Sequence, residues 1–191
     1  MNPEFSTFIN AINPLSEEVL EEVLQHFQAM EYPKNYVLLR QGKVCSHLWF
    51  LTKGAVRYFY SDEEGKDHNV WFSMDRDILT DTPSFLHEKP AEASIQLLED
   101  CTLWAIERKS IDALLLKHHS FALWYIKLFE QFYVNQIEDR IVDLQFLTAR
   151  QRYEKLLIQF PDIGQRISLG HIASYLNITQ ETLSRIRAGK S

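Results

Sequence analysis

The sequence is poor in cysteine and has no long hydrophobic run, and each deficit excludes a class of protein. Cys45 and Cys101 are the only cysteines among 191 residues, too few for a disulfide framework or a four-cysteine cluster. No apolar run approaches the roughly 18 residues that span a membrane, and the N-terminus has a charged Glu4 and no hydrophobic signal core. We therefore expect buried, reduced thiols and a cytoplasmic protein with no membrane partner.

Positive charge is also scarce, but only in the part of the chain before Thr148. The formal net charge is −6, which argues against a nucleic-acid partner when the chain is taken as a whole. From Thr148 onward, however, seven basic residues stand against three acidic ones, a net charge of +4, which leaves −10 for the residues before it. Because phosphate attraction depends on the local field, a basic C-terminal module on an acidic body is compatible with DNA binding.

The residues between positions 36 and 106 form short β-type runs separated by turn residues. A helix precedes them, from its N-cap Ser16 to about Phe27. The expected strands are residues 36–39, 47–51, 55–60, 68–72, 94–98 and 103–106, with turn residues such as Gly42 and Gly54 between several of them. Many short strands at this spacing predict a jelly roll or another small barrel.

A long helix is expected after this barrel and after a short helix over residues 110–117. Ser120 is its expected N-cap, and the helix extends to about Leu147. Its apolar residues form one stripe: Trp124, Leu128, Phe132, Ile137, Ile141 and Leu144. Such a stripe favours pairing with a second copy of the chain, and the alternative is that it packs only on its own barrel. Thr148 then offers a break and a new cap for a helix over residues 150–160.

The segment from Leu169 to Arg187 has the form of a helix-turn-helix. Its first stretch places Leu169, Ile172, Ala173 and Leu176 on one side of a short helix. Asn177 follows at the turn, because asparagine tolerates the left-handed conformation better than most residues. Thr179 is a suitable N-cap for a second helix that begins near Gln180. The alternative is a small helical hairpin with a solvated polar face.

The exposed face of the second helix carries side chains that can read bases. Leu183 and Ile186 are expected to point at the first helix, which leaves Gln180, Glu181, Ser184 and Arg185 outward, with Thr182 and Arg187 beside them. Arginine can bond guanine in bidentate fashion, glutamine can bond adenine, and glutamate can accept a hydrogen bond from cytosine N4. This face is therefore a candidate for double-stranded DNA.

Barrel, long helix and terminal helix-turn-helix, in that order, resemble the Crp/Fnr family of transcription regulators, and the resemblance covers nearly the whole chain. Its most specific part is the run Gln180-Glu181-Thr182-Leu183-Ser184-Arg185, which looks like the family's recognition helix. The resemblance implies that Glu181 and Arg185 read base edges and that Thr182 holds a phosphate. Gln180 stands where many members have arginine. Residues 38–42 and 47–56 are similar to the first strands of a cyclic-nucleotide-binding domain.

The ligand cassette implied by the resemblance departs from the family's pattern. Thr80 and Asp81 stand in place of a Gly-Glu pair, and Ala91, next to Glu92, stands in place of the arginine that holds the cyclic phosphate. An anion would meet a carboxylate instead of a guanidinium, so we expect an unknown small-molecule effector other than ordinary cyclic AMP. Asp81 and Ser94 would suit something neutral or hydroxylated, unless they are solvated loop residues.

Two other classes of function are alternatives to a regulator. A metal-dependent jelly-roll enzyme needs clustered ligands, whereas His47, His68 and His87 are isolated in sequence and His118-His119 falls in a helical turn, so we expect neither catalysis nor a metal or other cofactor. A ligand-binding or interaction module with a degenerate DNA-binding domain stays open, because only residues 161–165 separate Phe160 from Arg166, which is little room for a β-wing.

The sequence thus predicts an α+β fold in three parts. Residues 1–119 form a jelly-roll sensory domain that resembles cyclic-nucleotide-binding domains, residues 120–147 a long dimerisation helix, and residues 148–191 a helix-turn-helix DNA-binding domain. The expected partners are double-stranded DNA, a second copy of the chain and a small-molecule effector, and the resemblance leaves room for RNA polymerase.

Overall fold

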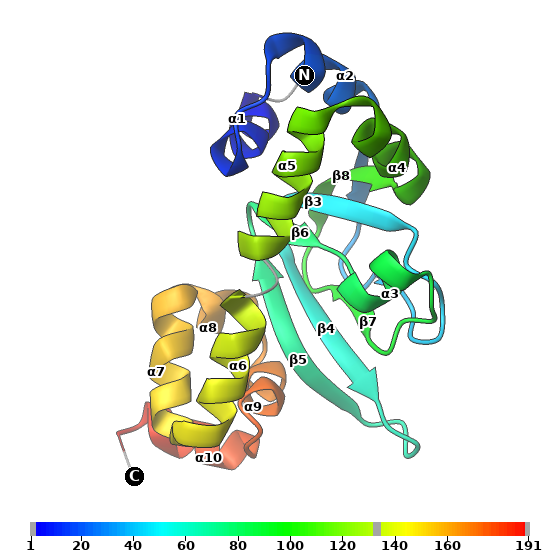
Figure 1. Ribbon diagram of the computed structural model, residues 1–191. Helices are drawn as coiled ribbons and strands as arrows, with labels where there is room; N and C mark the ends of the chain where they lie inside the picture. Colours follow the sequence, from blue (N-terminus) through cyan, green and yellow to red (C-terminus); the bar gives the residue numbers. More distant parts are fainter. Residues whose placement is uncertain (1–2, 132–134, 190–191) are drawn as a thin grey trace.

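The computed structural model describes residues 3–131 and 135–189 and divides into a β-roll and a bundle of C-terminal helices (Figure 1). The roll is closed at one end by α1 (Pro3–Ile12), α2 (Glu17–Gln25), α4 (Arg108–Lys117) and α5 (His119–Phe129). The C-terminal helices α6 (Asn135–Phe146) to α10 (Gln180–Arg187) lie beside the long hairpin of β4 (Ala55–Ser61) and β5 (Asp67–Met74). The fold is therefore α+β, as expected, with an antiparallel roll and a separate helical layer.

The roll consists of two four-stranded antiparallel sheets. One has the order β1 (Gln28–Tyr32), β8 (Cys101–Glu107), β3 (His47–Lys53) and β6 (Asp77–Leu79), and the other the order β2 (Val37–Leu39), β7 (Ser94–Leu97), β4 and β5. All six strands expected from the sequence are present, whereas β1, β6 and the short helix α3 (Thr82–His87) were not predicted. Gly54 joins β3 to β4 at φ +133°, and a Cβ there would overlap the Cys101 sulfur, so this turn accepts glycine alone.

The core of the roll continues into the helices that close it. Phe5 of α1 stacks on Phe50 with ring centroids 4.9 Å apart, and Trp124 of α5 donates from its indole nitrogen to the Ile9 carbonyl at 2.7 Å. Leu128, one turn further along α5, is 1% exposed. The stripe expected to pair with a second copy is therefore corrected at these two residues: Trp124 and Leu128 are buried in their own chain, and α1, which the sequence did not predict, holds Trp124.

The rest of the stripe lies on α6. Phe132 lies outside the described residues, and so does the side chain of Ile137. Ile141 and Leu144 are 51% and 44% exposed, so their side chains are available to another molecule. The expected start of the helical segment needs one correction: α5 begins at His119 after an N-cap at His118, not after Ser120, and His118 makes no side-chain capping bond.

The C-terminal helices have the boundaries that their caps dictate. Thr148 caps α7 (Ala149–Gln159) through a reciprocal pair of bonds with Gln151, a capping box. A short α8 (Ile163–Arg166) occupies the place where a wing could have been, and α9 (Leu169–Tyr175) follows. Within residues 148–189 every regular element that the structure describes is a helix. Helix α6 belongs with this group, because Lys155 of α7 pairs with Asp143 at 2.8 Å.

Candidate nucleic-acid interface and ligand pocket

The turn between α9 and α10 has the local geometry that the sequence predicted. Asn177 adopts φ +54°, the left-handed conformation that reverses the chain, and the Ile178 amide donates to the Ala173 carbonyl at 3.0 Å. Ser168 caps α9 by accepting a bond from the His171 amide. Thr179 caps α10, and its hydroxyl oxygen accepts from the Thr182 amide at 3.1 Å.

The buried side of this helix pair is small and tightly packed. Leu176 and Leu183 have no exposed surface, and Ala173 is 2% exposed. A side chain no larger than alanine at position 173 lets the two helices approach closely, as expected from the sequence. Ile172 completes the contact at 1% exposure. The position of α10 against α9 is therefore held by the fully buried Leu183.

The outer side of α10 faces solvent at the end of the molecule farthest from α1 (Figure 1). Its exposed side chains are Gln180, Glu181, Ser184, Arg185 and Arg187. Thr182 is half-buried, and its hydroxyl lies 2.9 Å from that of Thr179, so it already has a partner within the cap. Five of the six residues predicted to contact DNA thus share one exposed surface of α10.

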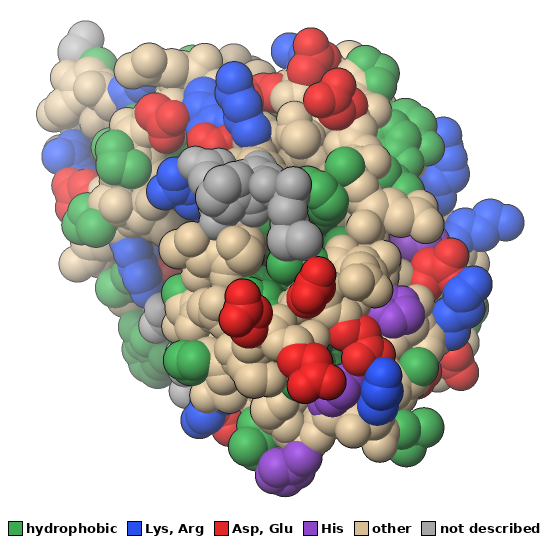
Figure 2. Space-filling model, turned by 90° about the horizontal axis from the view of Figure 1, so that it is seen from above, with side chains coloured by type: hydrophobic (Ala, Val, Ile, Leu, Met, Phe, Trp, Pro, Cys, Tyr) green, Lys and Arg blue, Asp and Glu red, His purple; other side chains and the backbone are tan. Residues whose placement is uncertain are grey.

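Much of the positive charge counted in the sequence is used inside the protein. Arg166 donates to Glu99 at 2.8 Å and to Asp75 at 3.0 Å, and Arg152 donates to the Leu176 carbonyl at 2.9 Å. Hydrogen bonds to Glu99 first and then to Asp75 raise the pKa of Arg166. At the opposite end of the molecule, seen in Figure 2, acidic side chains gather on the surface. The basic side chains that stay exposed on α10 itself are Arg185 and Arg187.

The helix pair is docked on the outer face of β4 and β5. Ala55, Phe72 and Met74 form one hydrophobic cluster with residues of α7 to α10, and the Phe72 and Tyr175 rings lie 5.2 Å apart. The Asn69 amide donates to the Ser174 hydroxyl at 2.9 Å. The hydrophobic core of the terminal helices is therefore completed by the roll.

His171 lies at the same contact. The Asn69 side chain donates to the His171 carbonyl at 3.2 Å, and Arg57 reaches Asn69 from the other side at 3.2 Å. Partial burial, together with the charge of Arg57, lowers the pKa of His171. A protonated imidazole is thus disfavoured while the helices are docked.

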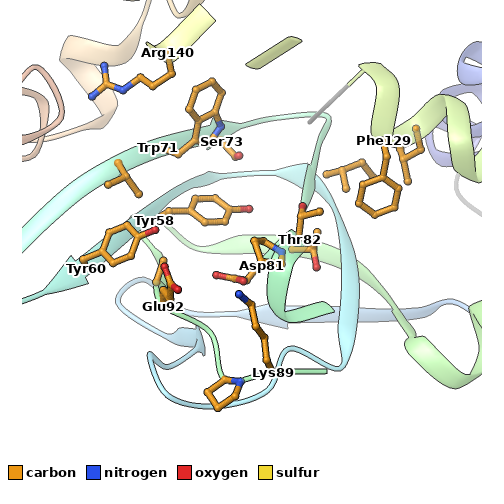
Figure 3. A pocket seen from close by; sticks show the side chains of 17 residues that line it. Tyr58, Tyr60, Trp71, Ser73, Asp81, Thr82, Lys89, Glu92, Phe129 and Arg140 are labelled. Carbon is orange, nitrogen blue, oxygen red and sulfur yellow. The ribbon is translucent and has the colours of Figure 1, made fainter. Parts of the chain in front are cut away.

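A pocket of about 290 Å³ opens on the inner face of the same two strands (Figure 3). It is lined by Tyr58 and Tyr60 of β4, Val70, Trp71 and Ser73 of β5, residues on both sides of α3, Leu128 and Phe129 of α5, and Arg140 of α6. A bulge in β5 makes this wall: Tyr58 pairs with Trp71 but Phe59 pairs with Asn69, so Val70 is the extra residue.

Three of the five predicted effector residues line this pocket, namely Thr80, Asp81 and Glu92. The other two, Ala91 and Ser94, do not line it. Ala91 is 3% exposed and its backbone pairs with Gly42 and Lys43, so its small side chain is turned into the roll. Ser94 accepts a bond from the Gln41 amide at 2.9 Å and lines a separate, shallow hollow on the other side of the sheet.

Most polar groups around the pocket already have partners. Asp81 caps α3 by accepting from the Ser84 amide at 3.0 Å, and burial raises its pKa although backbone bonds stabilise the charged form. The Thr80 hydroxyl donates to the His47 carbonyl. Burial also raises the pKa of Tyr58, which is hydrogen-bonded to Ser73. The interior of the pocket is therefore apolar and aromatic.

The sequence did not indicate Trp71 or Arg140 as site residues. Trp71 lines the pocket and also packs against the hydrophobic cluster of the terminal helices. Arg140 lies over the Tyr175 ring at 3.9 Å and donates to the Tyr175 carbonyl. Figure 3 shows its guanidinium turned away from the other labelled side chains. The sequence signal for Trp71 was the alternation of inward and outward side chains along β5, and the bulge at Val70 interrupts that alternation.

The described residues offer no cluster of three or more His, Cys, Asp or Glu side chains that could hold a metal ion. Both cysteines are buried and free, and burial raises the pKa of Cys101 to about 11. The expected burial of both cysteines is thus confirmed. No helix among the described residues is long and apolar enough to cross a membrane.

Several known proteins are similar to this chain in sequence. Residues 29–118 match the model of the cyclic nucleotide-binding domain. The chain is 23% identical over 185 residues to the cAMP-activated global transcriptional regulator CRP of Salmonella typhimurium, covering 91% of this chain and 87% of that protein. It is 25% identical to the cyclic AMP receptor protein of Thermus thermophilus, over 90% of this chain and 81% of the relative.

Solved structures show the same fold over most of the chain. FixK2 from Bradyrhizobium japonicum superposes with a TM-score of 0.72 at 18% identity, covering 85% of this chain and 83% of that one. A Crp/Fnr-family regulator from Eubacterium rectale superposes with a TM-score of 0.72 at 16% identity, covering 96% and 87%. These likenesses extend through both the roll and the terminal helices.

Proposed function

The chain belongs to the Crp/Fnr family of transcription regulators, and from that premise we propose that it binds a specific DNA sequence through α10 under the control of a small molecule in the roll. The observation that carries the proposal is α10 itself. It is capped by Thr179, held by Leu183 and exposed along the face that contains Glu181 and Arg185. A rigid helix with an accessible polar face can enter the major groove and keep its register there.

The proposed division of labour on α10 follows from side-chain geometry. Arg185 would read guanine in bidentate fashion and Glu181, one turn earlier on the same face, would accept from cytosine N4. Gln180, Ser184 and Arg187 flank them on the exposed surface, where they can contact bases or phosphates. The Thr182 amide is committed to the cap, so its proposed phosphate contact comes from the hydroxyl.

We place the homodimer interface on the exposed apolar side chains of α5 and α6. Leu123 and Ile126 of α5 are about half-exposed, as are Ile141 and Leu144 of α6, and Phe146 is 74% exposed. Contiguous apolar side chains on a soluble protein mark an interaction surface. A symmetric pair would present two copies of α10 to DNA about one helical turn apart, so the site would be roughly palindromic.

The pocket suits the role of effector site because two of its lining residues contact the helix-turn-helix. Arg140 contributes to its wall and binds Tyr175 of α9, the first helix of the helix-turn-helix. Trp71 contributes to the same wall and packs on the cluster that includes Leu183 of α10. A ligand that shifts either side chain changes the support of α9 and α10. The absence of an arginine at position 91 and the carboxylate of Glu92 argue against ordinary cyclic AMP as that ligand.

Selection from random double-stranded DNA with the full chain tests the proposal. We expect an enriched, roughly palindromic sequence, and binding that weakens steeply when salt is raised from about 50 to 200 mM. Sedimentation of the free protein should give twice the mass of one chain. Enrichment of no sequence together with salt-independent binding would contradict DNA recognition.

A degenerate DNA-binding unit is the second candidate, favoured by the helices-only composition of residues 148–189. Without a wing strand and with Arg166 held by carboxylates, fewer groups remain for phosphates. This candidate predicts a dimer that binds ligand and enriches no DNA sequence, so the same selection separates the two.

A further inference from the structure

The pocket on the inner face of β4 and β5 contains chemistry that selects a ligand class. Four aromatic rings line it, those of Tyr58, Tyr60, Trp71 and Phe129. Two polar atoms among the described residues are buried without a hydrogen-bond partner, on Thr52 and Arg152, and neither residue lines the pocket. A ligand therefore meets ring faces and edges, and finds few unsatisfied groups that it must pair inside.

The size of the pocket limits how much of a ligand can enter. A cavity of about 150 Å³ lined by apolar side chains is enough for benzene. The pocket here has about 290 Å³, which corresponds to one or two fused rings with a short substituent. Tyr58 and Trp71 are directly paired on the neighbouring strands β4 and β5, so their rings lie side by side in one wall of the pocket (Figure 3).

Charged side chains stand at one side of the pocket. Lys89, Asp81 and Glu92 come from the segment around α3, and Figure 3 shows the Lys89 ammonium directed toward Asp81. Lys89 stabilises the charged form of Asp81, while Glu92 adds a further negative charge. These three groups sum to a formal charge of −1, and the guanidinium of the fourth charged lining residue, Arg140, is turned away onto Tyr175 (Figure 3). An anionic substituent on this side of the pocket is therefore repelled, and an ammonium or hydroxyl is accepted.

We propose that this pocket binds a one- or two-ring aromatic molecule that bears a hydroxyl or amino group and no phosphate or carboxylate. The ring occupies the space between Tyr58, Trp71 and Phe129, and the polar group lies beside Asp81 and Glu92. An amino group gains a charge-assisted contact and an interaction with the ring faces. This inference rests on the proposed role of the pocket as the effector site.

A matched ligand series tests the inference by calorimetry on the full chain without DNA. The probes are 1-naphthylmethylamine, 1-naphthylmethanol and the anion of 1-naphthaleneacetic acid (the acetate), which share one ring system and differ in charge. Cyclic AMP is the phosphate probe. We expect the amine and the alcohol to bind, the acetate to bind at least tenfold more weakly, and cyclic AMP to give no detectable heat.

Two variants locate the binding. Val70→Phe fills the pocket and should abolish binding of the amine, whereas Ile158→Phe, at a position 82% exposed on α7, should leave it unchanged. Glu92→Gln removes a carboxylate from the rim and should narrow the difference between amine and acetate several-fold, whereas Glu63→Gln in the exposed β4–β5 turn should not.

The outcomes separate this inference from the proposed function. Tightest binding of the acetate, or binding of cyclic AMP that Val70→Phe abolishes, would overturn the ligand class. Failure of all four probes to bind would overturn it as well. DNA selection is measured separately, so an enriched sequence with no naphthyl binding would leave the regulator intact and reject this ligand class.

Discussion

Strands β4 and β5 present two faces that differ in what they pack against. The outer face, with Ala55, Phe72 and Met74, continues the hydrophobic core of the terminal helices. The inner face, with Tyr58 and Ser73, lines a pocket whose polar groups are satisfied. Because side chains alternate along a strand, neighbouring residues serve the two sites, and the pocket lies one sheet away from the helix-turn-helix.

The contrast shows how a ligand site can be coupled to a DNA-binding unit without a long path. A rigid sheet that packs tightly on one side transmits small changes on the other, because packed cores have few alternative arrangements. Trp71 belongs to both sites, and Arg140 joins the pocket to Tyr175. Substitutions on one face at a time should therefore affect the pocket and the terminal helices to different extents.

The largest effect is expected from the outer face. Phe72 is 1% exposed and packs near Tyr175, so Phe72→Ala should lower the free energy of unfolding by about 3 to 5 kcal/mol and weaken DNA binding. Val70→Ala on the pocket side, where the side chain is half-buried, should cost about 1 kcal/mol. Urea unfolding of both variants measures the difference. Equal losses would mean that the terminal helices gain little from the sheet.

The ionic contact at the edge of this interface should have the next largest effect. Arg166→Met removes the hydrogen bonds to Asp75 and Glu99 while keeping a long side chain, and we expect a loss of about 2 to 3 kcal/mol. Arg185→Met, on the exposed face of α10, is the matched control and should change stability by less than about 0.5 kcal/mol. If Arg166→Met leaves the free energy of unfolding unchanged, the carboxylates of Asp75 and Glu99 do not hold α8 to the roll.

Base recognition should be separable from stability. Arg185→Ala is expected to cost about 1 to 3 kcal/mol of DNA binding at one base pair and to relax selectivity there, because a bidentate contact to guanine is lost. Competition between the selected sequence and single-base variants of it measures this. Ser184→Ala on the same face should have a smaller effect. Unchanged selectivity in Arg185→Ala would remove Arg185 from the set of base readers.

Local signals explain why the terminal helices could be predicted. Thr148, Asn177 and Thr179 each act on neighbours within a few residues, and the structure places a capping box, a left-handed turn and an N-cap at these positions. A cap is selected by hydrogen bonds that the sequence itself contains. The helix boundaries that follow from them are accordingly within one or two residues of those expected.

The pocket and the buried stripe could not be predicted in the same way, because their partners are distant in sequence. Ala91 and Ser94 were expected at the ligand site, yet neither lines the pocket: the backbone bonds of Ala91 to Gly42 and Lys43 bury its side chain, and the pairing of Ser94 with Phe59 places it on the other side of the sheet. Trp124 and Leu128 form part of an apolar stripe in the sequence, but both are buried in their own chain, Trp124 through its bond to Ile9 of α1. Trp71 lines the pocket beside the bulge in β5, and no local sequence pattern predicts where a strand contains an extra residue.

The smallest expected effect is a pH dependence of the docked helices, and it arises from His171. Its pKa in the folded protein is lowered, by burial first and by Arg57 second, while Asp67 acts in the opposite direction. A folded state that resists protonation contributes stability above the ordinary histidine pKa and loses it as the pH falls through the folded value. The free energy of unfolding should therefore decrease more between pH 7.5 and 5.5 for the native chain than for His171→Gln. His68, whose ring is half-exposed and pairs with Asp62, supplies the control. If His68→Gln changes the pH dependence as much as His171→Gln does, the contact between α9 and β5 is not the source.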